Sequence, residues 1–148
     1  MTRKSIYLAE LIFNLNRFVD ENITSRPTEI VSSIPEDCHI AQGITGDYNA
    51  LSALYAEPEV LTIFAAKYSK MELVHYDDII NELAADFLNL HNGLFLVNLS
   101  ESENIESTLT PPVSDKSGEP LKAYTVTYVM PVDFKFGTVN FILSEKQG

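Results

Sequence analysis

The sequence predicts an α+β protein with two layers, in which long helices pack on one face of a mainly antiparallel sheet. Two patterns indicate this fold class. Apolar residues recur at helical spacing in three segments, whereas other segments alternate apolar and polar residues as strands do. Neither an internal repeat nor a domain boundary divides the 148 residues, so we expect residues 1–148 to form one domain.

The first half of the chain predicts a helix, an edge strand and a hairpin. The helix covers about residues 5–22, and an edge-like strand lies near 28–34. Two strands follow, about 38–45 and 48–56, joined at Gly46 and Asp47, because glycine tolerates the positive φ of a tight turn. The apolar side of the helix consists of Leu8, Leu11, Ile12, Leu15, Phe18 and Val19.

Two further helices are expected after the hairpin. Pro58 fits the first turn of a helix that ends near Tyr68. Its inward residues are Val60, Leu61, Phe64, Ala65 and Tyr68. A long helix runs from about residue 77 to the high nineties, with Asp77 and Asp78 at the positive end of its dipole. Its apolar stripe consists of Ile79, Ile80, Leu83, Phe87, Leu88, Leu90 and Leu94.

The last third of the chain predicts a polar loop followed by two strands. Residues 100–122 are rich in Pro, Ser and Glu, which predicts a strand fragment near 106–110 and then a mobile loop. The two strands are joined by a turn over 133–137. Tyr124, Val126, Tyr128 and Met130 share one face of the first strand, and Val139, Phe141 and Leu143 share one face of the second.

One face of the long helix carries a polar stripe made of Glu82, Asp86, Asn89 and Gly93. At about 100° per residue these positions fall within about 60° of one another. Two carboxylates, a carboxamide and a position without a side chain therefore share one face. A solvated outer face is the alternative interpretation, since any amphipathic surface helix has one.

The sequence around this stripe resembles the CheC/CheX/FliY family of phosphatases, which dephosphorylate the chemotaxis response regulator CheY. The segment from Asp86 to Gly93 is similar to the family signature E-x-x-N-x-x-x-G, with Asp86 in place of Glu. The longer family pattern has Asp or Ser four residues before the Glu, and Pro after a gap of 22 residues beyond the Asn. Here these positions hold Glu82 and Pro112, and residues 90–111 form the gap.

The resemblance extends from about residue 5 to about 144 and is strongest over 43–112. Residues 43–55 are similar to the family hairpin that precedes its second helix. Glu10 and Asn14 in the first helix are four residues apart rather than three, so the motif occurs once. A single motif resembles CheX rather than CheC, whose members have two. The resemblance thus implies a CheC/CheX-like fold.

The chemistry that the resemblance implies is hydrolysis of the aspartyl phosphate on a CheY-like regulator, without a covalent intermediate. Asn89 would orient the attacking water, and Asp86 would pair with the lysine at the phosphorylation site of the regulator. Glu82 would reach the same lysine, Gly93 would let the partner backbone approach, and Pro112 completes the pattern. The regulator would supply Mg²⁺, so the chain itself needs no cofactor.

Two other functions stay open. The shorter Asp86 favours a non-catalytic module that recognises or sequesters a regulator through the same helix, because a displacement of about 1 Å can cost about a hundredfold in rate. The breadth of the family also suggests a structural module of the flagellar switch. CheX proteins associate as dimers through their sheets, and the exposed alternating strands over 124–143 would allow such pairing.

Composition excludes several partner classes. The net charge is −11, from 21 acidic and 10 basic residues, which disfavours nucleic acid and anionic membrane surfaces and allows a protein with a cationic site. No apolar stretch approaches the roughly 20 residues of a membrane span. Glu10 and Asn14 interrupt any leader peptide, so we expect a cytoplasmic protein.

The histidines and the single cysteine indicate no further chemistry. Cys38 and His39 are neighbours in an expected strand, where their side chains would point to opposite faces. His39, His75 and His91 lack metal-binding spacing, so no metal site is expected. His91 lies near the motif and is expected to be an exposed helix residue, with pH sensing as the alternative.

Overall fold

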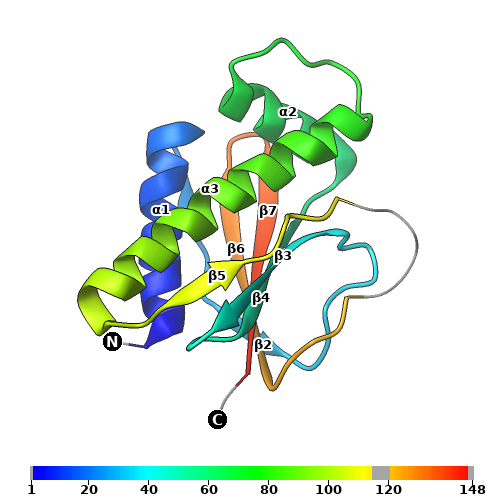
Figure 1. The fold of residues 1–148 in the computed structure, drawn as a ribbon. Coiled ribbons are helices and arrows are strands. Elements are labelled where there is room, and N and C mark those ends of the chain that lie inside the picture. The colour runs from blue at the N-terminus through cyan, green and yellow to red at the C-terminus, as the bar shows by residue number, and fades with distance from the viewer. Residues whose placement is uncertain (1, 115–120, 147–148) are drawn as a thin grey trace.

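The computed structural model describes residues 2–114 and 121–146. In these ranges three helices and seven strands form two layers (Figure 1). In chain order the elements are α1 (Arg3–Phe18), β1 (Thr24–Ser25), β2 (Glu29–Val31), β3 (Ile40–Gly46), β4 (Ala50–Tyr55), α2 (Pro58–Ser69), α3 (Asp78–Glu103), β5 (Ser107–Leu109), β6 (Val126–Phe134) and β7 (Gly137–Glu145). The α+β class predicted from the sequence is confirmed.

The strands form one antiparallel sheet in the order β1-β6-β7-β4-β3-β5, and β2 also pairs with β6. The hairpin β3–β4 has the predicted turn, in which Gly46 adopts φ +136°. A Cβ on this glycine would lie 2.8 Å from the carbonyl oxygen of Glu106. Gly46 is therefore required both by its backbone conformation and by the close passage of the chain that leads into β5.

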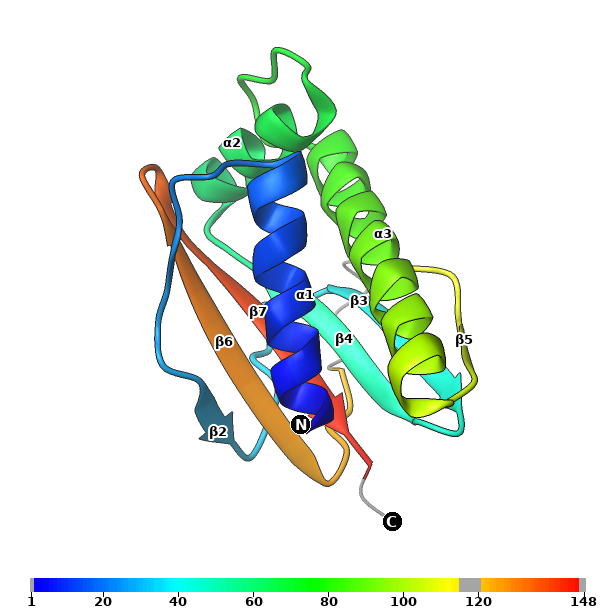
Figure 2. The same cartoon turned by 90° about the vertical axis from the view of Figure 1, so that its left-hand side faces the viewer.

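All three helices cover the same face of the sheet, and α1 and α3 lie side by side across it (Figure 2). The main core lies between the layers, where β6 and β7 present the predicted Met130, Phe141 and Leu143 to the helices. Each large apolar side chain that is fully buried contributes about 1.5–3 kcal/mol. The largest of these are Phe64, Phe87, Phe95, Phe141, Leu11 and Leu15. The packing between the layers therefore fixes where the surface of α3 lies.

The helix ends follow from capping groups. Helix α1 begins earlier than predicted because the Thr2 hydroxyl accepts a hydrogen bond from the backbone N–H of Ser5 at 3.1 Å. It also ends earlier, at Phe18 rather than near residue 22. Helix α3 begins as predicted, with Asp77 accepting from the N–H of Ile79 at 3.0 Å. It continues to Glu103, and Asn104 closes it in the left-handed conformation.

Two expectations about the later segments need correction. Residues 100–103 belong to the last turn of α3 rather than to a polar loop, whereas the strand fragment near 106–110 is present as β5. The loop predicted after it falls partly on residues 115–120, which lie outside the described ranges. The second correction concerns β6 and β7, which are not free to pair with a second copy: β7 lies between β6 and β4, and the other side of β6 pairs with β1 and β2.

Candidate active site

Helix α3 presents the polar stripe as its spacing predicts. Glu82, Asp86 and Asn89 are exposed and Gly93 is half-buried. The opposite side of the helix is anchored in the core by Ile80, Ala84, Phe87, Leu88, Phe95 and Leu99. This buried set corrects the predicted apolar stripe, since Ile79 is half exposed while Leu83, Leu90 and Leu94 are only partly buried. The stripe therefore lies on a helix whose rotation is fixed by packing.

The carboxamide of Asn89 is held by a buried glutamine from the sheet. Gln42 in β3 is 1% exposed, and its Nε2 donates to Asn89 Oδ1 at 2.6 Å. The same Nε2 donates to the carbonyl oxygen of Thr110 at 2.9 Å. On its other end, Gln42 Oε1 accepts a hydrogen bond from Asn92 Nδ2 at 3.0 Å. Asn89 therefore has a defined orientation although it lies at the surface.

The carboxylate of Asp86 is held from the opposite direction, by the last part of α2. The Tyr68 hydroxyl donates to Asp86 Oδ2 at 2.6 Å. Burial, and then the hydrogen bond to the Asp86 carboxylate, raise the pKa of the Tyr68 phenol well above its usual range, so it stays a donor at neutral pH. One carboxylate oxygen of Asp86 is thus bonded within the protein.

The supporting residues of the predicted site occupy more open positions. In the part of the chain that the structure describes, no side chain forms a hydrogen bond or ion pair with Glu82. A Cβ placed on Gly93 would meet no heavy atom within 4 Å, apart from the neighbouring backbone of its own helix. Pro112 is exposed and lies between Thr110 and Val113, both of which pair with β3. Space for an approaching partner is therefore present at Gly93, and Pro112 lies beside the strand that carries Gln42.

The charged residues of α3 are all acidic. Its ionisable acids are Asp78, Glu82, Asp86, Glu101 and Glu103, and the helix contains no Lys or Arg. A cationic group would therefore be attracted to the first third of this helix and to its last turn, where these acids lie.

His91 is not an exposed helix residue, contrary to the sequence-based expectation. It is fully buried, its Nδ1 lies 3.0 Å from Asn14 Nδ2 on α1, and its ring packs edge-on against Tyr7 at 4.6 Å between centroids. Burial lowers the pKa of His91 to about 3, so the ring is neutral. The expectation was wrong because α3 packs against α1 as well as against the sheet, so a larger part of the helix circumference is buried.

Cys38 and His39 also differ in setting from the expectation, because they precede β3 instead of lying within it. The Cys38 thiol is buried and donates to the carbonyl oxygen of Leu54 at 3.4 Å. Burial raises the pKa of Cys38 to about 12, so the thiol is protonated and unreactive at neutral pH. His39 Nδ1 instead lies 3.0 Å from the carbonyl oxygen of Asp37.

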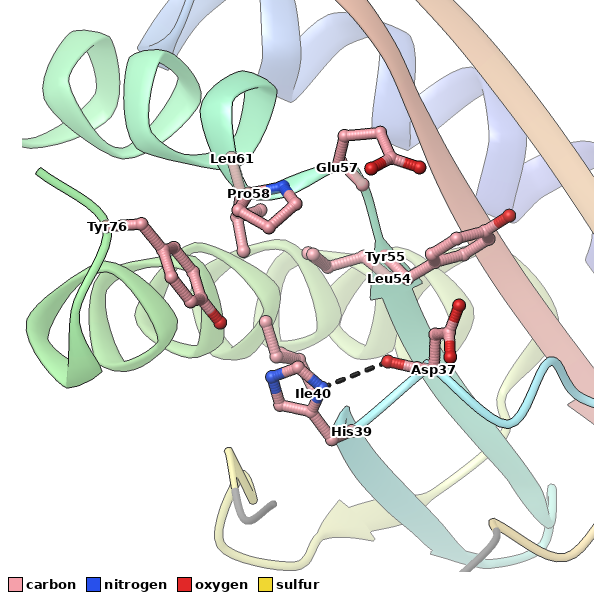
Figure 3. A pocket seen from close by; sticks show the side chains of 10 residues that line it. Asp37, His39, Ile40, Leu54, Tyr55, Glu57, Pro58, Leu61 and Tyr76 are labelled. Carbon is pink, nitrogen blue, oxygen red and sulfur yellow. Dashed lines mark hydrogen bonds between the residues drawn. The ribbon is translucent and has the colours of Figure 1, made fainter. Parts of the chain in front are cut away.

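A separate cavity of about 260 Å³ lies where β3 begins and β4 leads into α2 (Figure 3). His39, Asp37 and Tyr76 lie among its lining residues, and none of the stripe residues lines it.

Over residues 2–114 and 121–146, no group of three or more His, Cys, Asp or Glu side chains is arranged to hold a metal ion. Likewise, no helix in these ranges is long and apolar enough to cross a membrane. The stripe on α3 is therefore the candidate site.

Two residues of the site were missed by the sequence analysis. Gln42 occupies an inward position of β3 between the buried Ile40 and Ile44. The sequence could have indicated its role, because a polar residue stands here at a position where the alternation of the strand predicts an apolar one. Tyr68 was expected to point inward, and nothing in the local pattern indicates that its hydroxyl reaches Asp86.

Comparison with solved structures shows that the chain has the fold of CheX and CheC-like chemotaxis proteins. A chain of the CheX–CheY complex with BeF₃ and Mg²⁺ from Borrelia burgdorferi superimposes with a TM-score of 0.82 at 14% identity, over 99% of this chain and 99% of that one. A CheC-like superfamily protein from Shewanella sp. PV-4 gives 0.81 at 15% identity, over 99% and 100%. The chemotaxis protein CheX from Vibrio vulnificus gives 0.77 at 14% identity, over 95% and 97%.

No protein-family model matches the sequence, and no curated protein matches it. The similarity to the solved structures is therefore one of fold at low sequence identity, and it extends over nearly the whole chain. It confirms the fold that the resemblance implied.

Proposed function

We propose that this protein is a CheX-like phosphatase that hydrolyses the aspartyl phosphate of a CheY-type response regulator in the cytoplasm. The observation that carries the proposal is the pair Asp86 and Asn89, which lie exposed on one face of α3 and are each held by a side chain from another element. The fold, shared with CheX proteins over nearly the full chain, supports the same function.

The reaction requires little covalent chemistry from this chain. A water oxygen attacks the phosphorus in line, the bond between phosphorus and the aspartyl oxygen breaks, and inorganic phosphate and the aspartate carboxylate are released. Phosphoryl transfer of this kind depends mainly on positioning and charge stabilisation. Asn89 would position the water from outside, and no group of this chain would become covalently modified.

The regulator would bring the remaining groups. It would carry the phosphorylated aspartate together with Mg²⁺, which would neutralise charge on the phosphoryl oxygens. Asp86 would pair with the lysine of the regulator through the carboxylate oxygen that Tyr68 leaves free. Glu82, one turn earlier, would extend the acidic surface offered to that lysine, and Gly93 and Pro112 would border the docking surface.

The proposal is tested by following the decay of a phosphorylated CheY-type regulator with and without the protein. We expect faster decay with wild type, no acceleration by Asn89→Ala, and binding of the regulator retained by that variant. Glu106→Gln is a matched surface control away from the stripe and should behave as wild type. Decay that wild type leaves unchanged would contradict the phosphatase proposal.

A second candidate function is a non-catalytic module that binds or sequesters the regulator. Two observations favour it: Asp86 is one methylene shorter than the Glu of the family signature, and Tyr68 already bonds one of its oxygens. In that case wild type would bind the regulator without accelerating decay, and Asp86→Glu would introduce activity.

A homodimer is also proposed by analogy with CheX. Of the described strands, β1, β2 and β5 have an unpaired edge, which makes them the candidates for sheet pairing.

A further inference from the structure

We infer that Gln42 is a positioning residue that determines which end of the Asn89 carboxamide faces the docked partner. This inference rests on the proposed function. It starts from the atoms around Gln42, which is 1% exposed and makes hydrogen bonds to Asn89, Thr110 and Asn92.

The polarity of Gln42 follows from the backbone. A main-chain carbonyl oxygen can accept hydrogen bonds but cannot donate one. Because the Thr110 carbonyl lies 2.9 Å from the end of Gln42, that end must be the amide nitrogen. The other end is then the oxygen, which is consistent with the hydrogen bond that it accepts from Asn92 Nδ2 at 3.0 Å.

Thr110 is itself well anchored. Its N–H donates to the carbonyl oxygen of Gly43 at 2.9 Å, and its hydroxyl accepts from the N–H of Gly43 at 2.9 Å. A Cβ on Gly43 would lie 3.0 Å from the Thr110 hydroxyl oxygen, so glycine permits this close pairing. The carbonyl that orients Gln42 is therefore fixed to the same strand that carries Gln42.

The polarity of Asn89 follows from that of Gln42. Because Gln42 presents its amide nitrogen, the atom of Asn89 that lies 2.6 Å away must be the oxygen. The Asn89 amide nitrogen then points away from Gln42, and it donates to no side chain or backbone group in the described ranges. The outward group is thus an N–H donor.

This orientation suits the proposed reaction. A water that accepts a hydrogen bond from the Asn89 N–H keeps its second lone pair for the phosphorus atom. If the carboxamide could rotate freely, either its N–H or its oxygen could face the water. The water would then lie in line with the phosphorus in a smaller fraction of the complexes with the regulator. Gln42 acts only through Asn89, since it is buried and does not reach a docked partner.

The main test is the variant Gln42→Met, which keeps the length of the side chain and removes its hydrogen-bonding groups. We expect the maximal rate of regulator dephosphorylation to fall by about tenfold to a hundredfold, with regulator affinity unchanged. A full maximal rate in Gln42→Met would overturn the inference.

Loss of stability is controlled by Tyr7→Phe. This change removes a neighbouring buried hydrogen bond, between the Tyr7 hydroxyl and the hydroxyl of Ser52 at 2.6 Å, and removes none of the hydrogen bonds of Gln42. We expect Tyr7→Phe to keep the wild-type dephosphorylation rate. A rate loss in Tyr7→Phe equal to that in Gln42→Met would show that reduced stability, rather than positioning, explains the effect.

The outward N–H is tested by Asn89→Asp, which keeps an oxygen toward Gln42 and removes the outward donor. We expect this variant to lose the acceleration, and retention of the full rate would overturn the assignment of the N–H end.

A measurement without the regulator separates this inference from the proposed function. Three-bond NMR couplings between the Hβ protons and Nδ2 of Asn89 should report one χ2 rotamer in wild type and averaged rotamers in Gln42→Met. Averaged couplings in wild type would overturn the positioning role even if the protein is a phosphatase. One rotamer that is lost in Gln42→Met, in a protein that does not accelerate decay, would overturn the proposed function alone.

Discussion

Tyr68 and Gln42 reach α3 from two different elements and each holds one polar side chain of the stripe. An exposed carboxylate or carboxamide on a helix samples several rotamers, and holding one of them lowers the entropy lost when a partner binds. At the scale of single residues, the site therefore depends on side chains that lie outside its own helix.

The first residue-scale prediction concerns Tyr68→Phe, which removes the hydroxyl that bonds Asp86. A lost hydrogen bond of this kind is worth about 0.5–1.5 kcal/mol. We expect the dissociation constant of the regulator to rise by about threefold to tenfold, because Asp86 is no longer held for the lysine. Isothermal titration checks this, with Tyr124→Phe as the control at an exposed tyrosine. Tighter binding by Tyr68→Phe would show instead that Tyr68 competes with the partner.

The second residue-scale prediction concerns the pH dependence of stability. Burial lowers the pKa of His91 from 6.5 to about 3 in the folded protein, so the unfolded chain binds a proton that the folded chain does not. The stabilisation is full above pH 6.5 and is lost as the pH falls toward 3, at up to about 1.4 kcal/mol per pH unit.

We expect His91→Leu to flatten this part of the curve of unfolding free energy against pH, measured by urea unfolding. His75→Leu, at an exposed histidine, should leave the slope as in wild type. Equal slopes for wild type and His91→Leu would mean that His91 is accessible to protons in the folded state.

At the scale of elements, α3 combines a core face with an exposed polar face, because only one of its sides packs against the rest of the protein. Phe87 and Phe95 are fully buried, whereas the position above Gly93 is open. Glycine in a helix interior costs about 1 kcal/mol relative to alanine, so its presence here has a conformational cost. Close approach by a partner would account for it.

Gly93→Leu tests this account. We expect the substitution to raise the free energy of unfolding by about 0.5–1 kcal/mol, because leucine is a good helix former and a Cβ at this position meets no neighbouring side chain. The same change should weaken regulator binding by at least about tenfold through a steric clash. Thermal unfolding and titration measure the two effects. Unchanged affinity in Gly93→Leu would place the partner away from this part of α3.

At the scale of the whole molecule, charge favours a cationic partner. The net charge is −11, and α3 carries acids without a Lys or Arg. Fields of this kind accelerate the association of oppositely charged surfaces and are screened by salt.

We therefore expect the association rate constant with the regulator to fall about tenfold between about 50 mM and about 500 mM NaCl, measured by stopped flow. The variant Glu82→Gln should reduce this salt dependence, because it removes one exposed charge of the stripe, whereas Glu29→Gln in β2 should not. An association rate that is independent of salt would contradict electrostatic docking through α3.

Local sequence patterns were sufficient to predict much of the structure of this protein. The phase of Glu82, Asp86, Asn89 and Gly93 follows from helical geometry, and the Gly46 turn follows from backbone preference. Both depend on neighbours within a few residues, so the sequence alone determines them. It also determined the fold class, because the period of the apolar residues distinguishes helices from strands.

Only the tertiary structure decided how the site is held. Gln42 and Asn89 are 47 residues apart and Tyr68 and Asp86 are 18 apart, and no local period relates such pairs. His91 is buried because α1 crosses beside α3, and the outer side of β6 is occupied because β1 and β2 return to it. The physical reason is the same in each case: these contacts depend on how the two layers pack, which the sequence of a single element does not specify.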